Sequence, residues 1–162
     1  MVQINNEPDI TAGLAIGAAK SNKKLALYNC SREPEIVDLQ NCLNKMGAKI
    51  KGAGTDTIKI EGVDSLHGCE HSLIPDRNRA FSAAIDNLLS GKKAALKFVE
   101  PEHMKVGLAL LKGLGCVLSV SEDSVVIEPE VPADKMRELL KAIKPMPEPY
   151  PGVDGQMLRM FG

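Results

Sequence analysis

The chain has 162 residues, of which 44% are hydrophobic, 25% charged and only 3% aromatic, and its formal net charge is -1. This length suits one ordinary domain or two small ones with an aliphatic core. A nucleic-acid surface is not expected, because the chain lacks the positive charge and the aromatic stacking platforms that such surfaces use. No stretch approaches the roughly 20 apolar residues that cross a bilayer, and the N-terminus does not resemble a secretory signal. We therefore expect a cytoplasmic protein that does not bind membranes.

The cysteines and histidines show no pattern of a metal or disulfide framework. The four cysteines are Cys30, Cys42, Cys69 and Cys116. None of them form a C-x-x-C pair, and the three histidines lack metal-ligand spacing, so neither a metal nor another cofactor is expected. Without a signal peptide, disulfides are not expected either. We predict reduced and mostly buried cysteines that act as small apolar side chains.

The first part of the chain reads as two strand–helix pairs followed by a hairpin. The predicted elements are a strand over residues 2–4, a helix capped by Asp9 or Thr11 and ending near Lys20, a strand over 25–29, a helix from Pro34 to Met46, and strands over 48–51 and 57–63. Pro34 suits a first helical turn, where its missing N–H costs nothing. Gly47 is well placed to end the same helix.

The same order of elements recurs in the second part. The predicted elements are a strand over 71–74, a helix after Asp76 reaching Leu89, a strand over 94–99, a helix opening at Glu100 and ended by Gly115, and strands over 116–120 and 124–128. The triplet Glu-Pro-Glu occurs at residues 33–35 and again 67 positions later. This repetition indicates two copies of one β-α-β-α-β-β unit. We expect two helices on one face of a four-stranded mixed sheet in each unit, and helix-to-helix packing between the units.

Three segments follow from this pattern: a first unit over residues 1–65, a second over 66–130, and an extra helix with a proline-rich tail over 131–162. The extra helix, over residues 132–143, has Met136, Leu139 and Leu140 on one face. The tail over residues 144–152 contains four prolines, which exclude a helix or a central strand. Because apolar residues follow these prolines, we predict that the tail docks onto the core or onto a partner subunit.

Several motifs resemble the UDP-N-acetylglucosamine enolpyruvyl transferase family. The similar stretches are residues 32–39 (REPEIVDL), 43–50 (LNKMGAKI), 54–58 (GTDTI), 60–63 (IEGV), 66–68 (LHG) and 74–77 (IPDR). The resemblance implies an α/β (α+β) chain of tandem βαβαββ units in the EPSP synthase-like inside-out barrel fold, with an incomplete lobe. It also implies transfer of the enolpyruvyl group of phosphoenolpyruvate to UDP-N-acetylglucosamine, a step of peptidoglycan biosynthesis.

The resemblance also suggests site residues, and each has a structural alternative. Asp154 follows a Pro-Tyr-Pro-Gly segment like the one that precedes the family's acid/base aspartate, but a carboxylate in a detached tail fits it too. Glu33 is a candidate substrate contact or a helix-start acid. Asp76 and Arg77 are candidate substrate contacts, or a helix cap and a structural ion pair.

The chain departs from the family at positions that matter for catalysis. Glu7-Pro8-Asp9 stands where the family has a Ser-Val-Gly type segment that contacts the sugar nucleotide, and two acids there repel a diphosphate. The family's N-terminal Lys-Asn pair, its loop cysteine and its anion-binding arginine have no counterparts. We therefore expect a truncated enolpyruvyl transferase that is inactive alone, or a non-catalytic binding or regulatory module. Its partners would be a UDP-sugar or phosphoenolpyruvate, and a second copy or a complementary chain.

Overall fold

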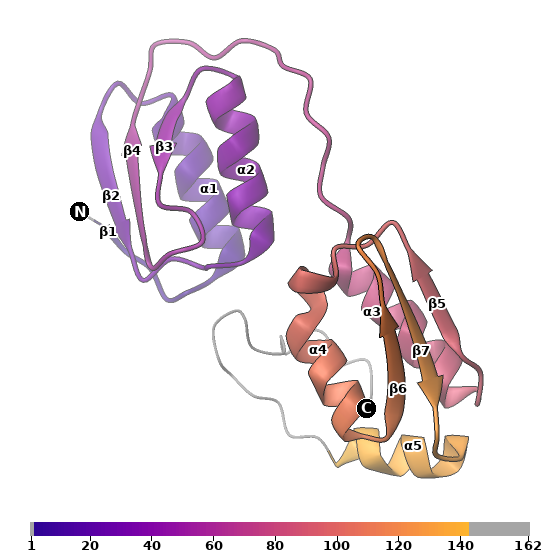
Figure 1. Ribbon diagram of the computed structural model, residues 1–162. Coiled ribbons are helices and arrows are strands. Elements are labelled where there is room, and N and C mark those ends of the chain that lie inside the picture. Colours follow the sequence, from indigo (N-terminus) through magenta and orange to yellow (C-terminus); the bar gives the residue numbers. More distant parts are fainter. Residues whose placement is uncertain (1, 143–162) are drawn as a thin grey trace. The chain divides into compact units, whose positions relative to one another are not determined.

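The chain folds into two units, each with its own hydrophobic core, and the boundary between them lies between Ile74 and Pro75. This is seen in a computed structural model that describes residues 2–142. The first unit ends at Ile74 and the second begins at Pro75, whereas the sequence placed the first boundary after residue 65. The later boundary follows from contacts that residues 67–71 make with the first unit. Figure 1 shows each unit as a sheet with helices against it.

The first unit contains a four-stranded mixed sheet with two helices on one face (Figure 1). Its elements are β1 (Val2–Gln3), α1 (Pro8–Ala19), β2 (Lys24–Tyr28), α2 (Pro34–Lys45), β3 (Lys49–Lys51) and β4 (Thr57–Glu61). The strand order is β1-β2-β4-β3; β1 runs parallel to β2, and the other pairs are antiparallel. Ile58 and Ile60 alternate with polar residues along β4, and both are buried with Leu27 of β2 in the core of this unit.

Prolines set the start of both helices in this unit. Pro34 opens α2 after the N-cap residue Glu33, as predicted, and Gly47 follows the helix with a φ of 100°. Pro8 opens α1 in the same way, so the N-cap is Glu7 and not Asp9 or Thr11 as the sequence suggested. The Thr11 hydroxyl instead donates to the Glu7 carbonyl oxygen at 2.8 Å, inside the first turn.

The described part of the second unit, residues 75–142, contains a three-stranded sheet. Its elements are α3 (Arg77–Leu89), β5 (Ala94–Lys97), α4 (Pro101–Gly113), β6 (Cys116–Val120), β7 (Ser124–Pro129) and α5 (Ala133–Lys141). The order β5-β7-β6 matches β2-β4-β3 of the first unit. Equivalent bonds recur as well: the Cys30 amide donates to the Asp56 carbonyl at 2.9 Å, and the Val99 amide donates to the Asp123 carbonyl at 3.0 Å. The repeated unit is thus visible in both topology and hydrogen bonding.

The predicted strand over residues 71–74 is wrong, and so is the four-stranded sheet expected for the second unit. These residues are not in a strand. His71 lies instead against α2 of the first unit, where its Nε2 is 2.8 Å from Oδ1 of Asp38. Both side chains are largely buried, with exposed fractions of 9% and 11%. The segment therefore contacts a helix of the first unit and adds no strand to the second.

The extra helix predicted from the sequence is α5, and it belongs to the second core. Met136 and Leu140 are buried in the same cluster as Phe81 and Leu88 of α3. The proline-rich tail lies outside the described residues, and so does its predicted docking.

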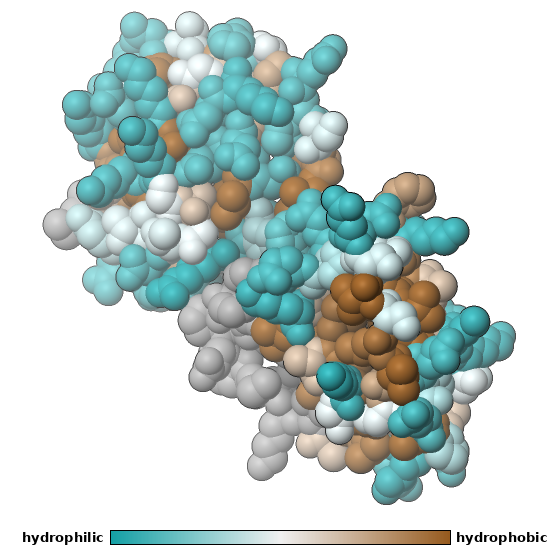
Figure 2. Space-filling model, viewed as in Figure 1, coloured by the Kyte–Doolittle hydropathy of each residue, from teal (hydrophilic) through white to brown (hydrophobic). Residues whose placement is uncertain are grey.

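The visible faces of the two units differ in polarity. Figure 2 shows a mostly hydrophilic surface over the first unit and a gathering of apolar side chains over the second. In the second unit, Val117 and Val120 of β6 are 46% and 55% exposed. In the first unit, helix α1 exposes Ile10 and Ile16. The helix-to-helix packing expected between the units stays a prediction.

Candidate functional site

The open face of the first unit's sheet forms a concave, positively charged surface. It encloses about 810 Å³ between β2, β3 and β4. Residues alternate across a strand, so the side chains opposite the core face this space. They include Lys24 and Tyr28 of β2, Lys49 and Lys51 of β3, and Lys59 and Glu61 of β4. Four lysines and one glutamate give this lysine face a net positive charge.

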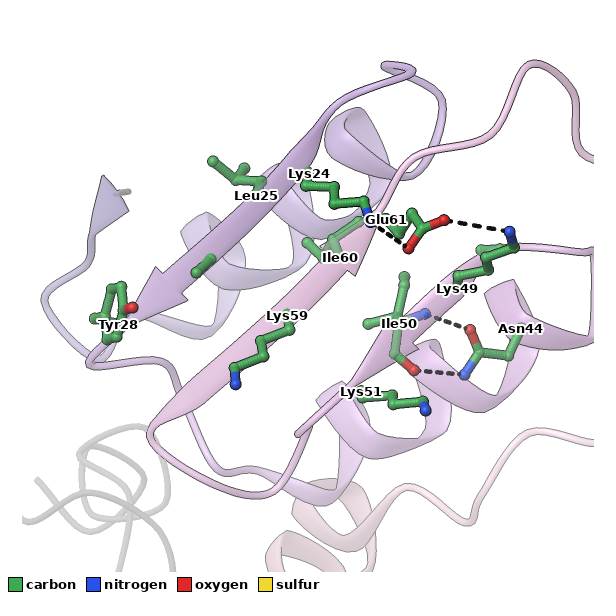
Figure 3. Close-up of a pocket in the computed structure, with 12 residues that line it drawn as sticks. Lys24, Leu25, Tyr28, Asn44, Lys49, Ile50, Lys51, Lys59, Ile60 and Glu61 are labelled. Carbon is green, nitrogen blue, oxygen red and sulfur yellow. Dashed lines mark hydrogen bonds and ion pairs between the residues drawn. The ribbon is translucent and has the colours of Figure 1, made fainter.

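Glu61 joins two of these lysines in one row across the sheet (Figure 3). Its carboxylate oxygens lie 3.3 Å from the Lys24 ammonium and 3.3 Å from the Lys49 ammonium. These residues are direct cross-strand partners. Hydrogen bonds from Lys24, and then from Lys49, hold the pKa of Glu61 below its ordinary value. Among residues 2–142, neither Lys51 nor Lys59 takes part in an ion pair. Both residues are exposed to solvent.

A side-chain amide of α2 fixes the edge of this surface. Asn44 accepts a hydrogen bond from the Ile50 amide and donates one to the Ile50 carbonyl, each at 2.8 Å (Figure 3). The outer edge of β3 therefore has its polar backbone groups paired, and the strand that carries Lys49 and Lys51 is held to the helix.

The lysine face presents ammonium groups that can attract an anion. Its ammonium groups are solvated, with Lys24 82% and Lys49 63% exposed at the side chain. Solvated charges of this kind contribute little directed binding energy. Within the part of the chain that the structure describes, no three His, Cys, Asp or Glu side chains are placed to hold a metal ion.

A second charged region lies where α1 and α2 begin. Both helices follow parallel strands, so they start at the same end of the sheet (Figure 1). The Thr11 hydroxyl of α1 accepts a hydrogen bond from the Ser31 amide at 3.1 Å and ties the two starts together. Glu7 and Glu33 are the N-cap residues of these helices, and the acids Asp9 and Glu35 lie in their first turns. These carboxylates carry negative charge near the positive helix ends and make them less favourable for an anionic ligand.

The sequence-predicted site residues are distributed over both units. Glu33 is the N-cap residue of α2 in the first unit. Asp76 is the N-cap residue of α3 in the second, where its carboxylate accepts a hydrogen bond from the Arg79 amide at 2.9 Å. Arg77 follows it and is buried, with 4% of its surface exposed. Asp154 lies outside the described residues. The structure supports the capping role of Asp76, and whether any of the four contacts a substrate stays a prediction.

Sequence reasoning missed the lysine face and part of the cysteine arrangement. The period-two spacing of Lys49 with Lys51 and of Lys59 with Glu61 was a signal for it, because such residues share one face of a sheet. The prediction of mostly buried cysteines is correct for Cys30 and Cys116 but wrong for Cys69, which is exposed. No helix among residues 2–142 has the length and apolar character that spanning a membrane requires.

Comparison with known protein families gives a match along most of the chain. Residues 10–162 match the family described as EPSP synthase (3-phosphoshikimate 1-carboxyvinyltransferase). The chain is 42% identical over 142 residues to UDP-N-acetylglucosamine 1-carboxyvinyltransferase 1 of Streptococcus agalactiae, a stretch that covers 88% of this chain and 32% of that protein. It is 43% identical over 139 residues to the UDP-N-acetylglucosamine 1-carboxyvinyltransferase of Kosmotoga olearia, covering 86% and 31%. The chain thus spans about a third of the length of these relatives.

A solved structure shares the fold. The enolpyruvyl transferase NikO from Streptomyces tendae superposes with a TM-score of 0.63 over 79% of this chain and 34% of that one, at 20% sequence identity. The mixed α/β architecture and the repeated units are therefore those of part of an enolpyruvyl transferase fold.

Proposed function

Because the chain belongs to the EPSP synthase family, we propose that it is a central portion of the framework of a UDP-N-acetylglucosamine 1-carboxyvinyltransferase. In this proposal, enolpyruvyl transfer from phosphoenolpyruvate to UDP-N-acetylglucosamine takes place only when the remainder of such an enzyme is present, and the 162-residue chain alone does not turn over. The observation that carries it is the 42% identity over 88% of this chain and only 32% of the relative.

The described residues support the lack of turnover by this chain alone. The reaction needs cations for the phosphate and carboxylate groups of phosphoenolpyruvate, and an acid and a base placed at the reacting atoms. Four cations of the first unit, Lys24, Lys49, Lys51 and Lys59, lie on the open sheet face, where they are solvated. The ends of α1 and α2 instead present acids, including Glu7 and Asp9 where the family has a sugar-nucleotide contact.

A second candidate function follows from that same acidic end. If the carboxylates at the starts of α1 and α2 repel the diphosphate group of UDP-N-acetylglucosamine, the chain does not bind this substrate. It would then act as a non-catalytic module that binds a related protein and regulates it. The two candidates differ in what they bind. A framework portion associates with an enzyme that lacks the matching stretch, whereas a regulatory module associates with an intact enzyme and changes its rate.

The test adds this chain to two forms of the Streptococcus agalactiae relative, one intact and one lacking the matching stretch. Association is measured by light scattering after size exclusion, and turnover by release of inorganic phosphate from phosphoenolpyruvate and UDP-N-acetylglucosamine. The proposal predicts association with the shortened form alone. Association with the intact enzyme and a changed rate would support the regulatory module, and association with neither form would contradict both.

A further inference from the structure

Residues 67–71 run along the outer side of helix α2, and we call them the α2-bound segment. The His67 amide donates to the Met46 carbonyl at 3.0 Å, the Cys69 thiol lies 3.8 Å from the Cys42 carbonyl oxygen, and His71 Nε2 lies 2.8 Å from Oδ1 of Asp38. Every second residue of the segment therefore meets every fourth residue of the helix. Two extended residues rise about 6.6 Å and four helical residues about 6 Å, so the two chains stay in register.

This register places two thiols together. Cys42 lies on the helix and Cys69 on the segment, with a pairing contact on either side of them at Met46 and at Asp38. Desolvation by burial, and then a hydrogen bond with the Cys69 thiol, raise the pKa of Cys42. The Cys69 thiol thus lies against the backbone of Cys42, and both cysteines are free.

Accessibility distinguishes this pair from the other two cysteines. Cys69 is exposed and Cys42 is half-buried, so a small oxidant in solvent can reach them. Cys30 and Cys116 are only 1% and 4% exposed, so an oxidant cannot reach them, although burial raises the pKa of these thiols as it does that of Cys42. Thiol reactivity requires an accessible thiolate, so the two buried cysteines are expected to stay inert.

We infer that Cys42 and Cys69 form a site of reversible thiol oxidation that links helix α2 to the α2-bound segment. With glutathione disulfide as the oxidant, the Cys69 thiolate attacks one of its sulfur atoms and releases one glutathione thiolate. Cys42 then loses its proton to solvent, attacks the Cys69 sulfur of the mixed disulfide and releases the second glutathione. Two protein thiols become one disulfide, and one glutathione disulfide is reduced to two glutathione molecules.

The bond would fix the segment that leads from the first unit to the second. In the reduced protein, the segment is held by the hydrogen bond at His67 and the His71–Asp38 pair. A disulfide between Cys42 and Cys69 would close a loop that includes the β3–β4 hairpin. Cross-links of this kind stabilise the folded state. Oxidation is therefore expected to raise the melting temperature of the first unit.

The test incubates the full 162-residue chain at graded ratios of reduced to oxidised glutathione, followed by alkylation and mass spectrometry. Trypsin places the four cysteines in different peptides, with Cys42 in residues 33–45 and Cys69 in residues 60–77. The inference predicts that these two peptides become linked while Cys30 and Cys116 remain alkylated. A linkage between other cysteines, or a stable glutathione adduct on Cys69 without this linkage, would overturn it.

Two variants sharpen the result. Cys69→Ser changes an exposed residue and is expected to abolish the linked peptide and the rise in melting temperature. His71→Ala removes the neighbouring contact, lowers the effective concentration of one thiol near the other, and should reduce the oxidised fraction at a fixed glutathione ratio severalfold. His103→Ala, which removes a similar pair with Glu100 in the second unit, is the matched control and should leave that fraction unchanged. An equal oxidised fraction in His71→Ala and wild type would contradict the proposed register.

Discussion

Asn44 and Ile50 are joined by two hydrogen bonds of 2.8 Å, so one side chain of α2 pairs with both polar backbone groups of one residue in β3. An unpaired edge strand can associate with other chains or separate from its sheet. Here the amide of Asn44 takes the place of a neighbouring strand. It positions the strand that carries Lys49 and Lys51 on the lysine face.

Asn44→Ala is expected to lower the free energy of unfolding by about 2 kcal/mol, because two partly buried backbone groups lose their partners. Urea denaturation measures the change. Asn87→Ala is the matched control: its amide donates to the Ala83 carbonyl on an exposed helix surface, and its loss should cost less than about 0.5 kcal/mol. Equal costs for the two variants would show that Asn44 does not hold the sheet edge.

Gly107→Ala tests the packing of the second core. A Cβ at Gly107 would lie 2.5 Å from Cε2 of Phe81, whose side chain is fully buried. The overpacking should cost about 1–3 kcal/mol in thermal or urea unfolding. Gly113→Ala, in the same helix with no atom within 4 Å of the added Cβ, should be neutral or slightly stabilising. A neutral Gly107→Ala variant would mean that α4 and Phe81 are not in close contact.

The pKa of Glu61 gives a prediction for acid conditions. Its folded-state pKa lies below the ordinary value of 4.5, so the two ion pairs contribute stability above that pH, and the contribution is lost as the pH falls through the lowered pKa. Lys24→Ala should raise the Glu61 pKa in an NMR titration of the carboxyl group, and Lys49→Ala should raise it less. High salt should weaken both effects because the pairs are exposed. A Glu61 pKa that neither variant changes would contradict the bridging geometry.

Replacing the acidic residues at the start of α1 is expected to strengthen the binding of UDP-N-acetylglucosamine. Glu7→Ser, Pro8→Val and Asp9→Gly together restore the segment type of the resembled family and remove two negative charges. Calorimetry should show tighter binding of UDP-N-acetylglucosamine than for the unchanged chain. Asp86→Ser with Glu122→Ser removes the same charge in the second unit and should give no gain. If both variants bind equally, the helix starts do not decide whether the sugar nucleotide binds.

Much of the fold could be predicted because its signals are local. Pro34 and Pro101 each follow a glutamate and open a helix, and both helices are followed by glycines with positive φ at Gly47 and Gly115. These features depend on a few neighbouring residues. The hairpins were predictable from another local signal, the alternation of apolar and polar residues along strands such as β4.

The features that the sequence did not show depend on contacts between distant residues. The segment around His71 has an extended pattern, but its pairing with Asp38 places it against α2 instead of in a sheet. Thr11 looked like a helix cap, yet its hydroxyl joins two backbone groups near the helix start. The contact between Cys42 and Cys69 requires the segment to turn back along the helix, and no spacing in the sequence indicates that.

The most direct test of the proposed function is the rate of inorganic phosphate release by the isolated 162-residue chain with phosphoenolpyruvate and UDP-N-acetylglucosamine. The Streptococcus agalactiae relative serves as the positive control, and heat-denatured chain sets the background. A framework portion of a carboxyvinyltransferase should release phosphate at the background rate at every chain concentration. Release that rises in proportion to chain concentration would contradict this account, because it would show that these residues alone contain a complete catalytic site.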